Sequence, residues 1–496
     1  MTGYQDAGAI KFLGTASPVL DQLLGGGLPE RSVTVVAGEP GAGKTIFALQ
    51  FIFHLARQNL KTLYFTTLSE PALKLVRYMQ MFSFFDQDLL DDRIVFVDLG
   101  ASLRTRDTGE LLRQIVDRVE QEEPAVVVID SFRAIHELLD SPAVGRAFVY
   151  DLAVQMAGWG ATTLLVGEYT PVEMSQEPEF SIADGIIRLT NKRQELTAVR
   201  EMEVLKLRGA NYMTGAHFVE IGPDGIVFYP RIRGPEIGSG RSASVSERVS
   251  SGVQGLDDLF DGGIPLHSST LLQGGSGTGK TLLGLHFLVE GARKGEPGIL
   301  FTLEETPDQL RDIARGFGWD LPALEAQGLL HISYTSPVEL SLDRFLHQML
   351  QRIAVTGARR VVLDSISSAA LGVSSERHFH EFVYALTKHC RVAGVTLAMT
   401  MEITELLGTA QLTGHGVSTV ADNIVLLRYV EVAAHLERAI SVLKVRGVAH
   451  HADLRRMTVG SDGVQVAAPF TGMHGVLTGL PMPVPAVAEK PRGGRR

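Results

Sequence analysis

Short runs of apolar and β-branched residues alternate along this chain with longer segments in which apolar residues recur at helical spacing. Runs of the first kind predict buried strands, and they occupy residues 33–37, 63–67, 125–129 and 162–166 and again residues 269–273, 299–303, 361–363 and 395–399. Segments such as 45–57 and 282–288 predict helices between them. Strands that are apolar throughout and separated by helices indicate an α/β fold, with a mostly parallel sheet covered on both faces.

A glycine-rich loop joins a strand to a helix in each half of the chain. Residues 38–45 read Gly-Glu-Pro-Gly-Ala-Gly-Lys-Thr, and residues 274–281 read Gly-Gly-Ser-Gly-Thr-Gly-Lys-Thr. Both fit the phosphate-loop pattern G-x-x-x-x-G-K-S/T, whose backbone N–H groups surround phosphate oxygens and whose lysine neutralises phosphate charge. The pattern predicts two sites for ATP, formed by Gly41, Gly43, Lys44 and Thr45 and by Gly277, Thr278, Gly279, Lys280 and Thr281. The two threonine hydroxyls are the expected Mg²⁺ ligands.

Further landmarks recur at nearly the same spacing, which indicates a tandem duplication. Residues 23–29 match residues 259–265, and Lys-Leu-Arg-Gly at 206–209 returns as Lys-Val-Arg-Gly at 444–447. We expect two phosphate-loop domains, a linker of small polar residues between them and a flexible tail. Their predicted bounds are 1–237 and 248–470 for the domains, 238–247 for the linker and 471–496 for the tail.

Composition narrows the class of protein. The chain has 496 residues, of which 45% are hydrophobic and 21% charged, enough for the buried cores of two domains. Cys390 is the single cysteine, so no internal disulfide can form. The sequence shows no signal segment and no apolar run of membrane-spanning length, which predicts a cytoplasmic protein without membrane contact. A net charge of −10 argues against general coating of nucleic acid.

An aspartate ends the third apolar run of each half, at Asp130 and at Asp364, and a serine follows both. The carboxyl ends of parallel strands face the phosphate loop, where an aspartate can bind Mg²⁺ directly or through water. An aspartate after a strand can also simply open a turn. Recurrence in both halves favours the metal role.

Acidic residues follow the next strand after each phosphate loop, and here the halves differ. Glu304 and Glu305 stand in the second half, whereas the matching residues of the first half are Ser69 and Glu70. A carboxylate at this place can polarise a water or a hydroxyl towards the γ-phosphate. It can also favour the dipole of a helix N-terminus. We therefore predict catalytic carboxylates at all three glutamates and a weaker first site.

Two cations recur on an apparent strand near the end of each half, Lys206 with Arg208 and Lys444 with Arg446. Residues two apart in a strand share one face, so each pair projects together. Such a pair suits a phosphate presented by a neighbouring subunit, as a trans-acting finger. The alternative is a solvated strand face, and the recurrence favours the functional interpretation.

Three stretches carry a resemblance to a known family, namely Phe-Thr-Leu-Glu-Glu-Thr-Pro at 301–307, Val-Ser-Thr-Val-Ala-Asp at 417–422 and Lys-Val-Arg-Gly at 444–447. With them the chain resembles the KaiC family of RecA-like P-loop ATPases over residues 11–470. The resemblance implies tandem RecA-like domains, a double-ring homohexamer and ATP bound between neighbouring subunits. It also implies ATPase and serine/threonine autokinase activity, as in the cyanobacterial circadian clock, and small clock- or signalling-type regulatory partners.

The resemblance assigns roles to single residues. Ser418 and Thr419 match the adjacent residues that carry phosphate in the family, and Thr413 matches a further threonine that can do so. Glu304 would be the general base and lie near the metal, with Glu305 beside it. Positions that contact nucleotide are matched by Trp319, Arg438 and His450. Without the resemblance, the two adjacent hydroxyl residues would indicate only a loop.

The chain also departs from the family's pattern. Ser69 stands where the family has a catalytic glutamate, Ala210 and Tyr212 replace a threonine and a histidine, and residues 475–479 differ from the segment that engages an activator. A second hypothesis is therefore a nucleotide-gated signalling scaffold with little phosphotransfer. A third is a RecA-like DNA-dependent ATPase, which shares the same core.

Overall fold

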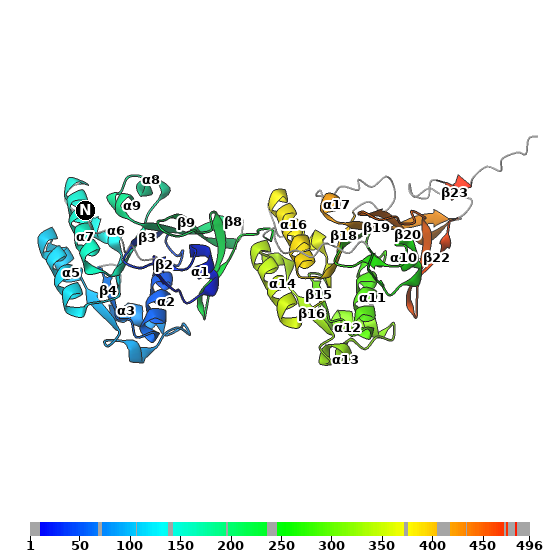
Figure 1. The fold of residues 1–496 in the computed structure, drawn as a ribbon, viewed down its shortest axis with the longest axis horizontal. Helices are drawn as coiled ribbons and strands as arrows, with labels where there is room; N and C mark the ends of the chain where they lie inside the picture. Colours follow the sequence, from blue (N-terminus) through cyan, green and yellow to red (C-terminus); the bar gives the residue numbers. More distant parts are fainter. Residues whose placement is uncertain are drawn as a thin grey trace, which may run out of the picture. The chain divides into compact units, whose positions relative to one another are not determined.

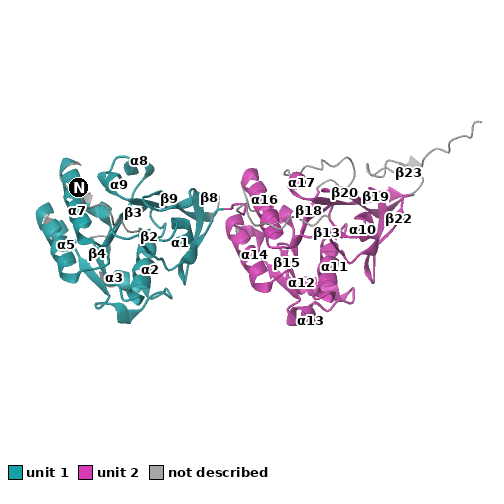
Figure 2. Ribbon diagram, in the orientation of Figure 1, with its two compact units in different colours: residues 1–231 teal, residues 232–496 magenta. Residues whose placement is uncertain are grey.

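The structure is a computed structural model that describes residues 10–67, 72–105, 107–136, 142–194, 197–235, 246–371, 375–403, 417–432, 434–470, 473–474 and 482–483. The chain divides into two compact units, Met1–Arg231 and Ile232–Arg496 (Figure 2). Ile232 belongs to the second unit because its backbone N–H donates to Asp343 Oδ1 (2.8 Å) and its side chain packs on a core of that unit. Among the described residues, no helix is both long and apolar enough to cross a membrane.

The first unit is built on one nine-stranded sheet with the order β11-β10-β9-β8-β3-β7-β6-β4-β5. Its elements are β1 (Phe12–Leu13), α1 (Pro18–Leu24), β2 (Leu28–Pro29), β3 (Val33–Gly38), α2 (Lys44–Arg57), β4 (Thr62–Thr66), α3 (Ala72–Met79), η1 (Gln87–Leu89), β5 (Ile94–Asp98), α4 (Gly100–Thr105), α5 (Thr108–Glu122), β6 (Val126–Asp130), α6 (Phe132–His136), α7 (Pro142–Trp159), β7 (Thr162–Glu168), α8 (Pro171–Met174), α9 (Pro178–Ile182), β8 (Gly185–Gln194), β9 (Thr197–Leu207), β10 (Ala216–Gly222) and β11 (Gly225–Tyr229).

The second unit repeats this plan with the sheet order β16-β15-β17-β18-β14-β19-β20-β21-β22. Its elements are β12 (Arg248–Val249), α10 (Gln254–Leu259), β13 (Ile264–Pro265), β14 (Ser269–Gly274), α11 (Lys280–Arg293), β15 (Gly298–Thr302), α12 (Pro307–Arg315), α13 (Leu321–Ala326), β16 (Leu330–Tyr334), η2 (Pro337–Glu339), α14 (Leu342–Thr356), β17 (Arg360–Asp364), α15 (Ile366–Leu371), α16 (Glu376–Val392), β18 (Thr396–Glu402), α17 (Val417–Val420), β19 (Asn423–Val432), β20 (His435–Val445), β21 (Arg455–Gly460), β22 (Gly463–Pro469), β23 (Met473–His474) and β24 (Met482–Pro483).

Successive residues of the central strands point to opposite faces of each sheet and enter different cores. In β3, Val36 packs with residues of α2, whereas Val35 packs with residues of α5 and α7. In β14, Leu272 and Leu271 divide in the same way between α11 and the pair α14 and α16. The expected fold, two tandem RecA-like domains whose mostly parallel sheets carry helices on both faces, is confirmed (Figure 1).

Long antiparallel strands extend each parallel sheet on the side of the phosphate-loop strand. β3 pairs with β8 in parallel, and β8 then pairs with β9 in antiparallel fashion; β14, β19 and β20 repeat this arrangement. The antiparallel partner brings Arg200 or Arg438 back beside the phosphate loop of its own unit. Each of these antiparallel strands, β9 and β20, ends at the amino edge of the parallel strands, where the Lys-x-Arg pair of its unit lies.

Candidate functional site

The phosphate loop of the second unit leaves β14 at the carboxyl edge of the sheet and ends where α11 begins. Gly277 and Gly279 have φ values of 72° and 103°, a left-handed conformation that glycine adopts without strain. A Cβ on Gly274 would lie 2.6 Å from the backbone oxygen of Leu427, so only glycine fits there. Lys280 Nζ donates to the carbonyl oxygens of Gly274 and Gly275, each at 2.9 Å. Burial lowers the pKa of Lys280.

A cavity of about 320 Å³ opens above this loop. It is lined by Ser276, Gly277, Gly279, Lys280, Thr281, Leu282, Glu304, Glu305, Ile313, Phe317, Asp364, Ser365, Glu402, Arg438 and Val459. The structure thus brings together most of the residues that the sequence predicts for this site. Sequence reasoning missed Ile313 and Phe317, which supply an apolar wall. Ile313 is 39% exposed on α12, and its place at the cavity is visible only in the structure.

The Asp364 carboxylate is buried next to the phosphate-loop threonine. Its side chain accepts hydrogen bonds from Thr281 and Thr400, and Oδ2 has no hydrogen-bond partner among the described residues. Burial raises the pKa of Asp364. A buried carboxylate oxygen with spare capacity beside a hydroxyl fits Mg²⁺, which binds through one or two carboxylates plus phosphates and water. No group of three or more His, Cys, Asp or Glu side chains in the described chain forms an all-protein metal cage.

Glu304 and Glu305 lie in the same cavity but in different surroundings. Glu304 Oε1 accepts hydrogen bonds from Ser365 Oγ (2.6 Å) and Ser368 Oγ (2.5 Å). One serine follows the end of β17 and the other lies on α15, and together they fix the position of Glu304. Glu305 Oε2 is buried and has no hydrogen-bond partner in the described part of the chain. Burial, with the charge of Asp364, raises the pKa of Glu305. Two carboxylates are therefore available for proton transfer, one oriented by hydroxyls and one with a free oxygen.

The first unit builds a related site with different supports. Thr45 Oγ1 and Tyr64 Oη both donate to Asp130 Oδ2, at 2.8 Å and 2.6 Å. Lys44 Nζ donates to the Glu39 carbonyl oxygen (2.8 Å) and lies 3.8 Å from Glu168 Oε1. Burial lowers the pKa of Lys44. The loop, the lysine, the threonine and the aspartate are therefore together, as the sequence predicts.

Some predicted residues fall in unexpected places or outside the described residues. Trp319 is 7% exposed and packs edge-to-face on His286, with ring centroids 4.5 Å apart; it is part of the core and does not line the cavity. His450 lies in the loop that follows Lys444 and Arg446. Predicted residues outside the described part of the chain are Ser69, Glu70 and Thr413.

The predicted phosphate acceptors lie at the opposite edge of the sheet from the phosphate loop. Thr270 at the start of β14 pairs with Asn423, and Gly274 at its end pairs with Leu427. Ser418 and Thr419 on α17 precede Asn423, so the whole length of β14 separates them from the loop. At about 3.3 Å per residue this is a gap of roughly 13 Å before the loop itself is counted.

The Lys-x-Arg cations share that edge. Lys444 Nζ donates to the carbonyl oxygens of Ser418 (3.0 Å) and Ala421 (2.8 Å), and Arg446 Nη2 donates to that of Thr419 (3.1 Å). Burial and the neighbouring arginine lower the pKa of Lys444. In the first unit Lys206 occupies the matching strand end, and Arg208 Nη1 lies 3.3 Å from Asp184 Oδ1. Both cations of the second unit therefore contact the acceptor helix of their own chain.

Comparison with known proteins agrees with this geometry. A family model described as the ATPase domain of KaiC matches residues 13–233 and again residues 249–470. The chain belongs to the KaiC family. The circadian clock oscillator protein KaiC of Acaryochloris marina is 33% identical over 475 residues, covering 93% of this chain and 89% of the relative. The circadian clock protein KaiC3 of a Synechocystis species is 32% identical over 491 residues, with 96% of each chain covered.

Membership in the KaiC family gives both units an ATPase assignment. The oscillator protein KaiC of Thermosynechococcus vestitus aligns at 32% identity over 498 residues, which are 98% of this chain and 94% of that protein. The alignment therefore spans both ATPase domains. A KaiC-type ATPase uses ATP and usually Mg²⁺, which the two phosphate loops and the strand-end aspartates are suited to hold.

Proposed function

We propose that the second unit transfers the γ-phosphate of ATP to Ser418 or Thr419 of a neighbouring subunit, in a homohexameric ring. The observation that carries this proposal is the placement of loop and acceptors at opposite edges of one sheet. An acceptor at the amino edge cannot reach the nucleotide of its own unit. A head-to-tail ring closes when the carboxyl edge of one subunit faces the amino edge of the next, and such heterologous interfaces generate cyclic oligomers.

Each residue then has a chemical role. Lys280 and the loop amides would hold the phosphates, while Thr281 and Asp364 would hold Mg²⁺, which neutralises charge on the phosphates when bound. Glu304, fixed by two serine hydroxyls, would take the proton of the attacking hydroxyl, with Glu305 beside it. Lys444 and Arg446 arrive from the neighbour together with the acceptor helix. They would stabilise the charge of the transferring phosphoryl group.

Mixed rings test whether transfer runs between subunits. Lys280→Ala removes the phosphate-loop lysine but keeps both acceptors, whereas a Ser418→Ala, Thr419→Ala double variant keeps the loop but loses both hydroxyls. Neither variant alone is expected to carry phosphate at residues 418 or 419 after incubation with Mg-ATP. Mixed and reassembled rings should carry phosphate at these residues on the Lys280→Ala subunits only, as read by mass spectrometry.

Wild-type protein is the positive control of this experiment. The absence of phosphate on Lys280→Ala subunits in mixed rings whose wild-type counterpart is phosphorylated would contradict transfer between subunits. A wild-type hexamer that binds ATP and carries no phosphate at Ser418, Thr419 or Thr413 would contradict the kinase proposal itself. In that case the second unit would hydrolyse ATP without transferring phosphate to the protein.

A second function, a nucleotide-gated scaffold for a small signalling or clock-type partner, is favoured for the first unit by Ser69 in place of a glutamate. Nucleotide bound at an interface stabilises the assembly that binds it. Lys44→Ala is therefore expected to shift the protein from hexamer to smaller species by light scattering at fixed ATP, with Lys11→Ala as an exposed control. An unchanged hexamer would remove this role from the first phosphate loop.

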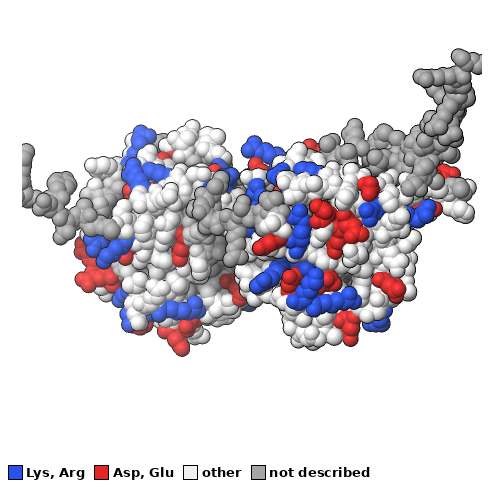
Figure 3. Space-filling view, turned by 45° about the vertical axis from the view of Figure 1, so that its right-hand side comes forward, with Lys and Arg blue, Asp and Glu red and all other residues white. Residues whose placement is uncertain are grey.

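A DNA-dependent motor receives no support from the face of the protein shown in Figure 3 or from the net charge. Figure 3 shows basic and acidic side chains interspersed on the face in view rather than gathered into a basic stripe. The chain also carries a net charge of −10. Binding to nucleic acid depends on neutralising many phosphates with Lys and Arg. We therefore propose no nucleic-acid partner.

A further inference from the structure

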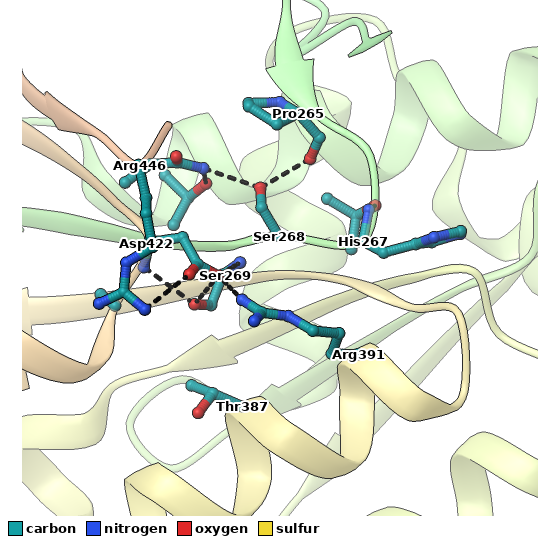
Figure 4. A network of polar contacts seen from close by, with 12 residues as sticks. Pro265, His267, Ser268, Ser269, Thr387, Arg391, Asp422 and Arg446 are labelled. Carbon is teal, nitrogen blue, oxygen red and sulfur yellow. Dashed lines mark hydrogen bonds and ion pairs between the residues drawn. The ribbon is translucent and has the colours of Figure 1, made fainter. Parts of the chain in front are cut away.

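The carboxylate of Asp422 is the centre of a polar network at the amino edge of the second unit (Figure 4). Asp422 lies two residues after the last residue of the acceptor helix α17, and its side chain is 4% exposed. Oδ2 accepts hydrogen bonds from the backbone N–H of Ser269 (3.0 Å), from Ser269 Oγ (2.9 Å) and from Arg391 Nη2. The pKa of Asp422 is lowered overall: burial raises it, but the hydrogen bonds from Arg391 and Ser269 lower it by more. The group is therefore a carboxylate.

Arg446 contacts the same carboxylate only loosely. Its Nη1 lies 3.6 Å from Asp422 Oδ1, which is an ion pair without a hydrogen bond, and its side chain is 50% exposed. Its Nη2 donates to the carbonyl oxygen of Thr419. The guanidinium that is proposed to act on a neighbour's phosphate is therefore held near the acceptor but not sequestered.

The first unit shows what happens when the network is smaller. Asp184 takes the place of Asp422, and there Arg208 Nη1 does form a hydrogen bond, at 3.3 Å to Oδ1. Val33 begins β3 where Ser269 begins β14, and only its backbone N–H donates to Asp184, at 3.2 Å. Counting back from β7 and β18 places Ala157 where Arg391 stands. With fewer donors on the carboxylate, the edge arginine lies closer to it, at 3.3 Å against 3.6 Å, although the Arg208 side chain is 62% exposed and that of Asp184 is 35% exposed.

We propose that Arg391 is a positioning residue for phosphoryl transfer: by holding Asp422 from the side of α16, it keeps Arg446 available to the neighbouring subunit's phosphate. This inference rests on the proposed function of the second unit. A buried carboxylate with a single cation draws that cation into a close charge-assisted pair. When Arg391 and Arg446 share the single negative charge of Asp422, the positive charge of Arg446 is only partly neutralised. Ser269 acts in the same direction, because its two donors occupy Oδ2.

Arg391→Ala tests the proposal. A trans-acting arginine contributes about 10³–10⁵ in rate, so its partial withdrawal is expected to lower phosphate incorporation at Ser418 and Thr419 at least about tenfold. The KM for ATP should change less than the rate of incorporation, because the proposed role of Arg446 is to stabilise charge in the transition state. Arg391→Lys keeps the cation and should stay close to wild type. Hexamer content and melting temperature are measured for each variant, and rates are expressed per hexamer.

The combination of Arg391→Ala with Asp422→Asn separates positioning from general damage. Removing the carboxylate frees Arg446 again, so incorporation should return towards wild type. Ser269→Val imitates the first unit without removing a cation, and it should lower incorporation in the same direction if Arg391→Ala does not assemble. Unchanged incorporation in Arg391→Ala or in Ser269→Val, or no recovery in the double variant, would overturn the role of Arg391.

Arg446→Ala is the reference for the whole series. If Arg446→Ala leaves incorporation at the wild-type rate, the proposed trans function has failed and the Arg391 inference falls with it. If Arg446→Ala abolishes incorporation while Arg391→Ala has no effect in an intact hexamer, only the inference about Arg391 has failed. The two failures are therefore distinguishable in one set of measurements.

Discussion

Arg446→Ala is expected to lower phosphate transfer to Ser418 and Thr419 by about 10³-fold or more, the range in which trans-acting arginines contribute to phosphoryl transfer. Arg446 lies 3.1 Å from the Thr419 carbonyl oxygen and half of its side chain is exposed, so it is presented together with the acceptor. ATP affinity should fall by a smaller factor than the transfer rate, because Arg446 is proposed to stabilise the charge that develops on the neighbour's ATP during transfer. Quantitative phosphosite mapping over time, beside nucleotide binding, measures both quantities.

Arg377 provides a matched control for this prediction. It is an exposed arginine of the same unit, on α16, and its ion pair with Glu381 is four residues away on the same helix. Arg377→Ala should leave transfer unchanged, and Arg446→Lys should fall between wild type and Arg446→Ala because the ammonium cannot reproduce the guanidinium fork. Equal rates in Arg446→Ala and Arg377→Ala would show that Arg446 takes no part in the chemistry.

Glu304→Gln is expected to lower phosphotransfer and the ATP hydrolysis of the second unit by about 10²–10⁴-fold, the usual loss when a general base is removed. The amide keeps the size and the contacts with Ser365 and Ser368 but cannot accept a proton from the substrate hydroxyl. Glu70→Gln should change turnover little, because the first unit already has Ser69 in place of one carboxylate. Steady-state hydrolysis and phosphosite mapping of the two variants decide between the units.

Glu305→Gln shows which carboxylate accepts the proton. Glu305 has the buried free oxygen and the raised pKa, whereas Glu304 is held by hydroxyls. A larger loss in Glu305→Gln than in Glu304→Gln would move the general base by one residue. If Glu70→Gln abolished turnover while both second-unit variants kept it, the working site would be in the first unit.

Much of the fold was accessible from the sequence because the information is local. The strand before each phosphate loop, the loop and the following helix are contiguous, and their apolar periodicity and glycines describe them without tertiary contacts. Asp130 and Asp364 were found because strand ends in a parallel sheet must meet at one edge. The duplication added a second observation of every landmark, and the described structure contains both copies.

Contacts between distant residues could not be predicted in this way. Tyr64 supports Asp130 in one unit, and Thr400 supports Asp364 in the other, although neither lies near its aspartate in sequence. Trp319 was assigned to nucleotide, but its surroundings are decided by packing against His286. A side chain's partners depend on which elements pack together, and the pattern of one segment does not contain that information.

The sequence by itself determined that this chain has two phosphate loops and an aspartate at the matching strand end of each half. It also determined that the halves differ in one carboxylate, with Ser69 in the first where Glu304 stands in the second. Only the tertiary structure decided that Ser418 and Thr419 lie a full strand away from their own loop, next to Lys444 and Arg446. The physical reason is the register of β14 with β19 and of β19 with β20. Pairing between strands far apart in sequence places the start of one beside the end of another, and composition and periodicity along the chain do not specify that pairing.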